Sequence, residues 1–187
     1  MKFVSFYGTH ALATFGIGMR LFNVVFLPLL GLAMGGSAVA GQNLGANQIN
    51  RTHQTALWTA FIGSIITGII AAVTVIFPEQ IIRLFVNNNQ VVEIGKNMIY
   101  IIAPSFVAIA ISMGLNTVFS GSGYNFPYLM SGIASRWLFQ IPFSALVVYV
   151  FNLPIFFIWI GFLVSEFIEL LVILIYYYQG RWKNTRV

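Results

Sequence analysis

The stretch from Leu21 through Asn50 contains no Asp, Glu, Lys or Arg and is dominated by apolar and small side chains. A helix needs roughly 20 predominantly apolar residues to cross the hydrocarbon core of a bilayer, so this stretch alone is long enough to span a membrane. Charged residues make up only 7% of the chain, whereas they make up roughly a quarter of a soluble domain. So few charges cannot cover the surface of a soluble fold, and we therefore expect lipid to surround most of the chain.

Polar connectors and turn residues divide the rest of the sequence into further apolar runs. These runs are near-continuous and far longer than a typical strand of about 4–8 residues, which favours helices over strands. The sequence therefore predicts an all-α integral membrane protein that crosses the cell membrane several times. The five predicted spans cover about residues 12–42, 54–77, 95–120, 128–150 and 155–178.

Five spans place the two ends of the chain on opposite sides of the membrane. Basic residues are nearly balanced between the two sides, so the positive-inside rule decides little from their number alone. The end of the chain, however, combines Trp182 with the bases Arg181, Lys183 and Arg186. We expect residues 180–187 to form a basic cytoplasmic tail, which puts the first residues outside and indicates that the chain is the tail of something longer.

The composition argues against several other classes of protein. There is no cysteine, which excludes a disulfide framework and a thiolate metal site. The two histidines, His10 and His53, lie far apart in sequence, and no Ser/His/Asp arrangement is visible. The nine basic residues form no patch for a nucleic acid. We therefore expect no enzyme activity, no cofactor, no metal and no nucleic-acid partner.

The most distinctive segment runs from Gly31 to Ala46 and consists mainly of Gly, Ala and Ser. Small residues four apart allow two helix backbones to approach closely, although such pairs taken alone are also common in ordinary membrane helices. As a whole, the string AVAGQNLGA at residues 38–46 resembles the signature that closes an inner helix in the multidrug and toxic compound extrusion (MATE) transporters. The residues assigned to this helix packing are Gly31, Gly35, Gly41, Gln42, Asn43 and Gly45.

Four other segments resemble MATE proteins in the same order. They are ALATFGIGMR at 11–20, LPLLG at 27–31, GSGYNFP at 121–127 and RWLFQIP at 136–142. MATE proteins have twelve helices in two six-helix lobes, and this chain resembles helices eight to twelve, with residues 1–6 as the last turns of the seventh. The resemblance implies a partial six-helix lobe whose N-terminal partner lobe is missing.

The resemblance also implies the export of drugs or amphipathic organic cations, driven by Na⁺ or H⁺ entry in an antiport cycle. Soft apolar side chains with a few polar ones suit a cavity for varied compounds, although such residues more often serve plain packing. The candidate lining residues are Met19, Asn23, Met34, Met113 and Asn116. A proline inside a span removes a helix hydrogen bond, so Pro28, Pro104 and Pro142 are candidate hinges.

The charged residues expected of the family for ion coupling are not found here. The positions that match the tyrosine and aspartate of the sodium-coupled branch are about Val107 and Ile111, whose side chains cannot bind a cation. Two carboxylates, Glu166 and Glu169, nevertheless lie within the last span, where an ionised side chain needs a partner. Either the complete protein couples through its N-terminal lobe, or the chain belongs to a divergent branch.

Arg136 can provide that partner. The fourth and fifth spans turn at Asn152, and Arg136 and Glu169 are each about sixteen residues from this turn, so two α-helices would bring them to equal depth. We predict an Arg136–Glu169 pair, with Glu166 about one turn closer to the membrane centre. Glu166 is then either a proton or cation site or part of a polar clasp between helices.

Two alternatives to a drug exporter remain open from the sequence. A lipid-linked oligosaccharide flippase of related fold would be expected to have more bases in its cavity, where only Arg136 qualifies. A single lobe also cannot form a central cleft by itself, so the chain could be a non-functional remnant that needs an N-terminal half.

Overall fold

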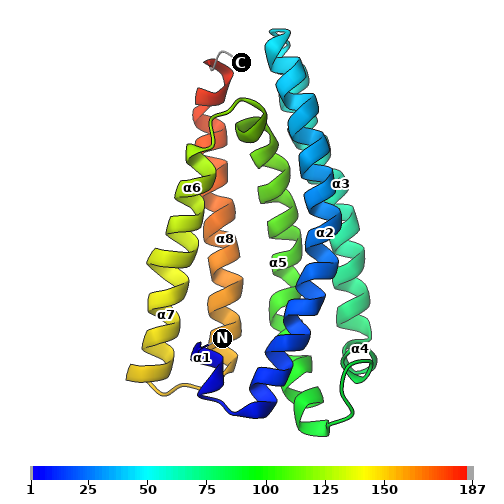
Figure 1. Cartoon of the computed structure of the whole chain (residues 1–187), viewed down its shortest axis with the longest axis vertical. Coiled ribbons are helices and arrows are strands. Elements are labelled where there is room, and N and C mark those ends of the chain that lie inside the picture. Colours follow the sequence, from blue (N-terminus) through cyan, green and yellow to red (C-terminus); the bar gives the residue numbers. More distant parts are fainter. Residues whose placement is uncertain (1, 185–187) are drawn as a thin grey trace.

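The computed structural model describes residues 2–184, and five helical segments in this range are long and apolar enough to cross a membrane. The predicted all-helical architecture with five spans is confirmed, and Figure 1 shows the spans running side by side. The spans are α2 (Thr9–Gly45), α3 (Ile49–Ile76), α5 (Asn89–Gly121), a fourth segment from Phe126 to Val150, and α8 (Phe156–Gln179).

Three short helices complete the chain: α1 (Lys2–Ser5), α4 (Pro78–Arg83) and η3 (Arg181–Asn184). Two connections depend on asparagine in the left-handed region, where its short side chain is tolerated: Asn47 (φ 57°) before α3 and Asn152 (φ 47°) before α8. These tight turns make consecutive spans antiparallel. As a result, α1 and the end of α8 lie at opposite ends of the bundle (Figure 1).

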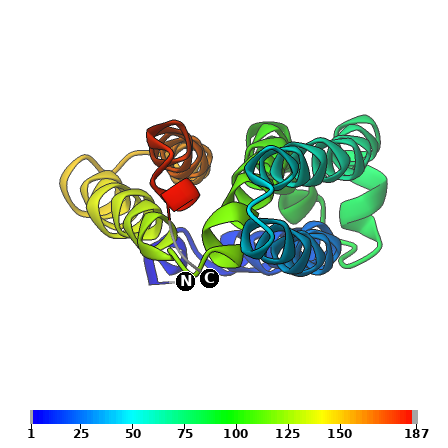
Figure 2. The same ribbon diagram turned by 90° about the horizontal axis from the view of Figure 1, so that it is seen from above.

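The central helix of the bundle is α5, which packs against α2, α3 and α8. Two groups are visible from above: α2, α3 and α5 on one side, and the fourth span with α8 on the other (Figure 2). Most of the apolar part of α5 is buried, because neighbouring helices surround it, whereas α2 and the fourth span expose most of theirs.

Small residues let α5 approach its neighbours within the first group. A Cβ added at Gly114 would collide with the backbone of Ala60 on α3. One added at Gly121 would lie 2.6 Å from the carbonyl oxygen of Ser37 on α2. Such close backbone contact is the usual means of association between membrane helices, since lipid offers no hydrophobic drive.

The fourth span is less regular than the others. Two of its four segments are π-helices, in which each hydrogen bond reaches the fifth residue along instead of the fourth. A π-turn therefore contains more residues than an α-turn and advances less per residue. The segments are α6 (Phe126–Gly132), the π-helix η1 (Ile133–Gln140), α7 (Ile141–Ala145) and the π-helix η2 (Leu146–Val150).

Candidate functional site

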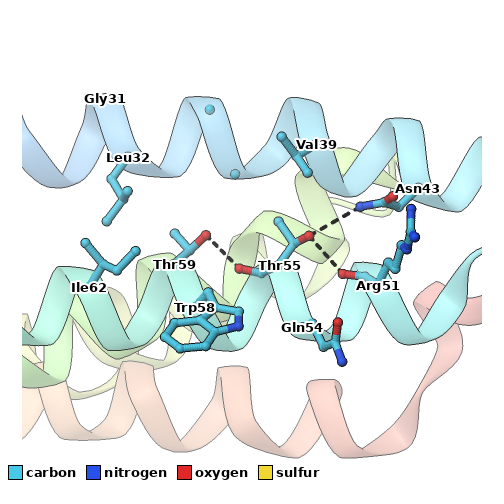
Figure 3. A pocket seen from close by; sticks show the side chains of 12 residues that line it. Gly31, Leu32, Val39, Asn43, Arg51, Gln54, Thr55, Trp58, Thr59 and Ile62 are labelled. Carbon is cyan, nitrogen blue, oxygen red and sulfur yellow. Dashed lines mark hydrogen bonds between the residues drawn. The ribbon is translucent and has the colours of Figure 1, made fainter.

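A groove of about 600 Å³ opens between α2 and α3 (Figure 3). Its walls are apolar at one end, where Leu32 faces Ile62, and polar at the other. The lining residues are Gly31, Leu32, Gly35, Gly36, Val39, Asn43, Arg51, Gln54, Thr55, Trp58, Thr59 and Ile62.

A chain of hydrogen bonds closes the polar end of the groove. Asn43 Nδ2 donates to Thr55 Oγ1 at 3.4 Å, and the Thr55 hydroxyl donates to the carbonyl oxygen of Arg51 at 2.8 Å. These bonds join α2 to the first turns of α3. The groove therefore offers an apolar wall and a hydrogen-bonding end, which is a surface that suits an amphipathic molecule.

The glycines of the signature segment occupy two different environments. Gly41 meets the carbonyl oxygen of Gly121, 3.0 Å from where its Cβ would lie, so this residue is at the crossing with α5. Gly31, Gly35 and Gly45 have open space at that position, and the first two line the groove. The side chain of Gln42 is exposed. Gly36, which the sequence analysis did not select, is in close contact with Thr59 and Thr117.

The residues considered for a cavity lining are divided between two helices. At 3.6 residues per turn, Met19, Asn23 and Met34 lie within about 60° of one another on α2. All three are exposed. On α5, Met113 packs against the apolar core, and Asn116 is half-buried with its Oδ1 atom lacking a hydrogen-bond partner among the described residues.

A second, smaller pocket of about 70 Å³ lies between α2, α5, η1 and α8, and the sequence analysis did not identify it. Its walls are aromatic: Phe15 stacks on Trp159 with ring centres 6.4 Å apart, and Phe22 meets Phe162 edge-on at 6.3 Å. The sequence pattern that could have indicated this pocket is an apolar helix face formed by Phe15, Met19 and Phe22 of α2. The pocket is lined by Phe15, Gly18, Met19, Phe22, Met98, Ile102, Gln140, Ile158, Trp159 and Phe162.

Next to this pocket, Arg136 on η1 pairs with two carboxylates on α8. Its Nη2 atom lies 2.7 Å from Glu166 Oε1 and 3.5 Å from Glu169 Oε2. The predicted Arg136–Glu169 pair is confirmed. Glu166, which was expected one turn beyond Glu169 and either as an ion site or as part of a polar clasp, is the closer of the two partners.

The π-helices explain this difference. The depth estimate assumed two α-helices, but the fourth span advances less per residue between Arg136 and the turn at Asn152. Arg136 is therefore level with a residue nearer to the start of α8. Glu166 precedes Glu169 by three residues, or about 4.5 Å along an α-helix.

Further polar side chains surround the guanidinium group. Its Nη1 atom donates to Gln140 Oε1 at 3.1 Å and to Ser165 Oγ at 3.0 Å. Ser135 donates to Glu169 Oε2 at 3.2 Å. The side chain of Glu166 is 3% exposed, that of Glu169 18% and that of Arg136 35%, so the acids are the more enclosed side of the cluster.

Another charged group lies outside the spans, between α4 and α5. Arg83 donates to Glu79 Oε1 at 3.0 Å, to Asn87 and to Asn89, and Lys96 lies 3.7 Å from Glu79. The hydrogen bond from Arg83 is the main reason that the pKa of Glu79 lies below its usual value. These contacts join the short helix α4 to the start of α5.

The three candidate hinge prolines all lie inside membrane spans. Pro28 is in the middle of α2 and Pro104 in the middle of α5. Pro142 is near the start of α7, directly after η1. Among residues 2–184, no three His, Cys, Asp or Glu side chains come together as a group that could hold a metal ion.

The C-terminal aromatic and basic residues only partly fall within the described residues. Trp182 is buried, stacks on Tyr177 at 5.9 Å and donates its Nε1 hydrogen to the Tyr177 carbonyl. Arg181 and Lys183 are exposed on η3, and Arg186 lies outside the described residues.

Comparison with known protein families gives one clear result. The sequence model of a family described as MatE matches residues 1–146. A solved structure described as the outward-facing conformation of a multidrug resistance MATE family transporter of the MOP superfamily has the same fold, with a TM-score of 0.84 at 17% identity. The match covers 99% of this chain and 40% of that one.

Three named relatives extend the comparison. The probable multidrug resistance protein YoeA of Bacillus subtilis is 26% identical over 100% of this chain and 40% of its own length. The probable multidrug resistance protein NorM of Thermotoga maritima is 25% identical over 96% and 39%. Protein DETOXIFICATION 29 of Arabidopsis thaliana is 29% identical over 87% and 33%. The chain thus spans about 40% or less of the length of these relatives.

Proposed function

This chain belongs to the MatE family, and from that premise we propose that it is the C-terminal part of a multidrug exporter. The transporter exchanges amphipathic or cationic organic compounds for H⁺ or Na⁺. The observation that carries this proposal is a likeness that extends over the whole chain to relatives named multidrug resistance proteins. None of the matched names indicates a lipid-linked oligosaccharide flippase, so that alternative is not favoured.

The working transporter in this proposal contains a second, N-terminal lobe. The exposed face of α2 that carries Met19, Asn23 and Met34 turns towards that lobe and lines the cavity between the two. This assignment is supported by the exposure of Met19 (45%) and Met34 (67%), which leaves two adaptable apolar side chains uncovered.

The two hollows described above differ in what they can accept. At about 600 Å³, the α2–α3 groove falls in the range of roughly 300–1,000 Å³ typical of sites for drug-sized ligands. The aromatic pocket of about 70 Å³ is too small for such a compound. We assign drug contact to the α2 face and the groove, and bending of the spans during transport to Pro28, Pro104 and Pro142.

In this proposal the chain crosses the cell membrane with residues 180–187 in the cytoplasm. The exposed bases Arg181 and Lys183 next to buried Trp182 support that orientation, since positive charge beside a span is typical of the cytoplasmic side. A reporter fused to the C-terminus that is active only in the cytoplasm tests it, and an inactive reporter on a fully expressed fusion would reverse the orientation.

Transport is tested in proteoliposomes that contain this chain together with an N-terminal lobe taken from the Thermotoga maritima relative. With the assembly, we expect an imposed H⁺ or Na⁺ gradient to drive a fluorescent organic cation across the membrane in the direction opposite to the ion. With the chain alone, we expect no such movement. Asn23→Leu should slow this movement, whereas Trp137→Phe, on the exposed side of η1, should leave it unchanged. An assembled, correctly inserted pair that moves no dye under either gradient contradicts the exporter function.

A further inference from the structure

Two acids and one base meet near the middle of two membrane spans. Glu166 is the eleventh residue of the 24-residue helix α8, and Arg136 is the eleventh of the 25 residues in the fourth span. Both carboxylates lie within 3.5 Å of the same guanidinium nitrogen. If both acids were ionised, the cluster would carry one net negative charge.

Among residues 2–184, Arg136 is the only base that pairs with either acid. The bases on the surrounding elements lie elsewhere: Arg20 of α2 is over the ring of Phe85, Lys96 of α5 is close to Glu79, and Arg181 and Lys183 are on η3 after the end of α8. Helix α2 also carries His10, in its first turn. An uncompensated charge at the centre of a membrane helix is strongly unfavourable. The other titratable residues on elements packed against α8 and η1, or on α8 itself, are Glu93, Tyr100, Tyr128, Tyr176, Tyr177 and Tyr178.

A bound proton would neutralise this net negative charge, and it fits the cluster better than a metal cation does. Hard cations such as Ca²⁺ and Mg²⁺ take about six or more oxygen ligands, whereas a proton needs only one oxygen atom. The oxygens of Gln140, Ser165 and Glu166 already accept hydrogen bonds from Arg136. The guanidinium thus occupies the position where a metal ion would collect its ligands.

A buried hydroxyl without a partner lies on the neighbouring helix α5, which runs in the same direction as α8 (Figure 1). Ser112 follows the pocket residues Met98 and Ile102 along α5, just as Glu166 and Glu169 follow the pocket residues Ile158 and Trp159 along α8. Ser112 is 5% exposed and its Oγ atom has no hydrogen-bond partner among the described residues.

The cluster can also be reached from the aromatic pocket. Gln140, which accepts a hydrogen bond from Arg136, forms part of the pocket wall. Phe162, whose ring centre lies 5.8 Å from the Arg136 guanidinium carbon, forms another part. The wall of the pocket is therefore in contact with Arg136, the base that pairs with both acids.

We propose that Glu166 and Glu169 share one proton at neutral pH, with Arg136 as a fixed counter-charge, and that this proton is the coupling ion of the cycle. The proton belongs to the pair rather than to either acid, because both carboxylates lie within 3.5 Å of the same guanidinium nitrogen. The coupling role of this proton rests on the proposed transport function, but the number of protonated acids can be measured without any transport.

The test is infrared difference spectroscopy of the full chain in lipid nanodiscs, which detects the carbonyl stretch of a protonated carboxylic acid. We expect one protonated acid per chain at pH 7. Glu166→Gln and Glu169→Gln should each reduce the number to zero, because the remaining acid is balanced by Arg136. Arg136→Gln should raise it to two, and Glu93→Gln, an exposed acid at the start of α5, is the matched control that leaves it at one.

Several results overturn the proposal. The proposal is wrong if the wild-type chain shows no protonated acid at pH 7, and this result does not depend on whether the variants fold. A signal that persists in both single glutamine variants, with circular dichroism showing them folded, assigns the proton elsewhere. If adding Na⁺ at constant pH abolishes the signal, sodium rather than a proton is the ion that the site binds for coupling.

The spectroscopic result and the transport assay can fail separately. If the pair is protonated but the assembly moves no dye, the proton site stands and the exporter function is wrong. If the assembly moves dye while its acids are all ionised, the exporter function stands and the proton site is wrong.

Discussion

The two halves of the bundle are held together by different interactions. In the group of α2, α3 and α5, glycine residues bring helix backbones into direct contact, as at Gly114 and Gly121. Between the fourth span and α8, an arginine and two glutamates bridge the helices instead. Contact through small residues works at one separation only, whereas long charged side chains can adjust. The first group is therefore held by close backbone packing and the second by ion pairs.

The largest effect is expected where the helices of the first group pack most closely. Gly114→Leu places a side chain where the backbone of Ala60 lies, so helices α3 and α5 must separate. Overpacking usually costs about 1–3 kcal/mol, and we expect this variant to exceed the upper end because backbone has to move. Thermal unfolding in detergent measures the loss. Gly35→Leu, in open space on α2, is the control, and an equal loss in both variants would contradict the packing role of Gly114.

The charged half gives the next largest effect. Arg136→Gln leaves the buried Glu166 and the half-buried Glu169 without their base. We expect the unfolding free energy to fall by about 2–3 kcal/mol, less than for a fully buried pair because Arg136 is partly exposed. Replacing Glu166 and Glu169 by Gln in the same chain should recover most of the loss. Chemical denaturation of the single and triple variants measures both changes; no recovery would mean that Arg136 stabilises through packing alone.

The start of α5, the helix of the first group that also packs against α8, gives a smaller effect. The side chain of Asn88 accepts hydrogen bonds from the backbone N–H groups of Gln90 and Val91. Asn88→Ala should lower stability by about 1 kcal/mol, as is typical for the loss of an N-cap. Asn125, before α6, makes no such capping bond, so Asn125→Ala should change the melting temperature less.

The smallest effect should come from the exposed charges that join α4 to α5. Because the pKa of Glu79 is lowered in the folded state by Arg83, the contribution of this pair is fully present above the ordinary value of 4.5. It is lost as the pH falls through the lowered pKa. The protection factors of the α4 amides, which compare the observed exchange rate with the intrinsic rate at the same pH, should therefore fall in acid, and Glu79→Gln should remove this fall. Protection factors that stay constant with pH in wild type would show that the pair is not stabilising.

The sequence was sufficient for the architecture because length and apolarity alone decide which segments can cross a lipid bilayer. It also identified Arg136 and Glu169 as partners, since unpaired charges within a span have few alternatives. It missed Glu166 as the closer partner, because nothing in residues 133–140 reports that each turn will be wider than usual. It also missed the aromatic pocket, whose walls come from four elements that only tertiary packing brings together.

The π-helices of the fourth span have a consequence for insertions and deletions. A π-turn contains more residues than an α-turn of the same height. Deleting one residue from η1 can therefore restore an α-turn and leave both ends of the span in place. A loss among residues 133–135 would move Arg136 further from the turn at Asn152, away from Glu166 and towards the level of Glu169. A one-residue deletion there is thus expected to change the ionic partner of Arg136 rather than to shorten the span.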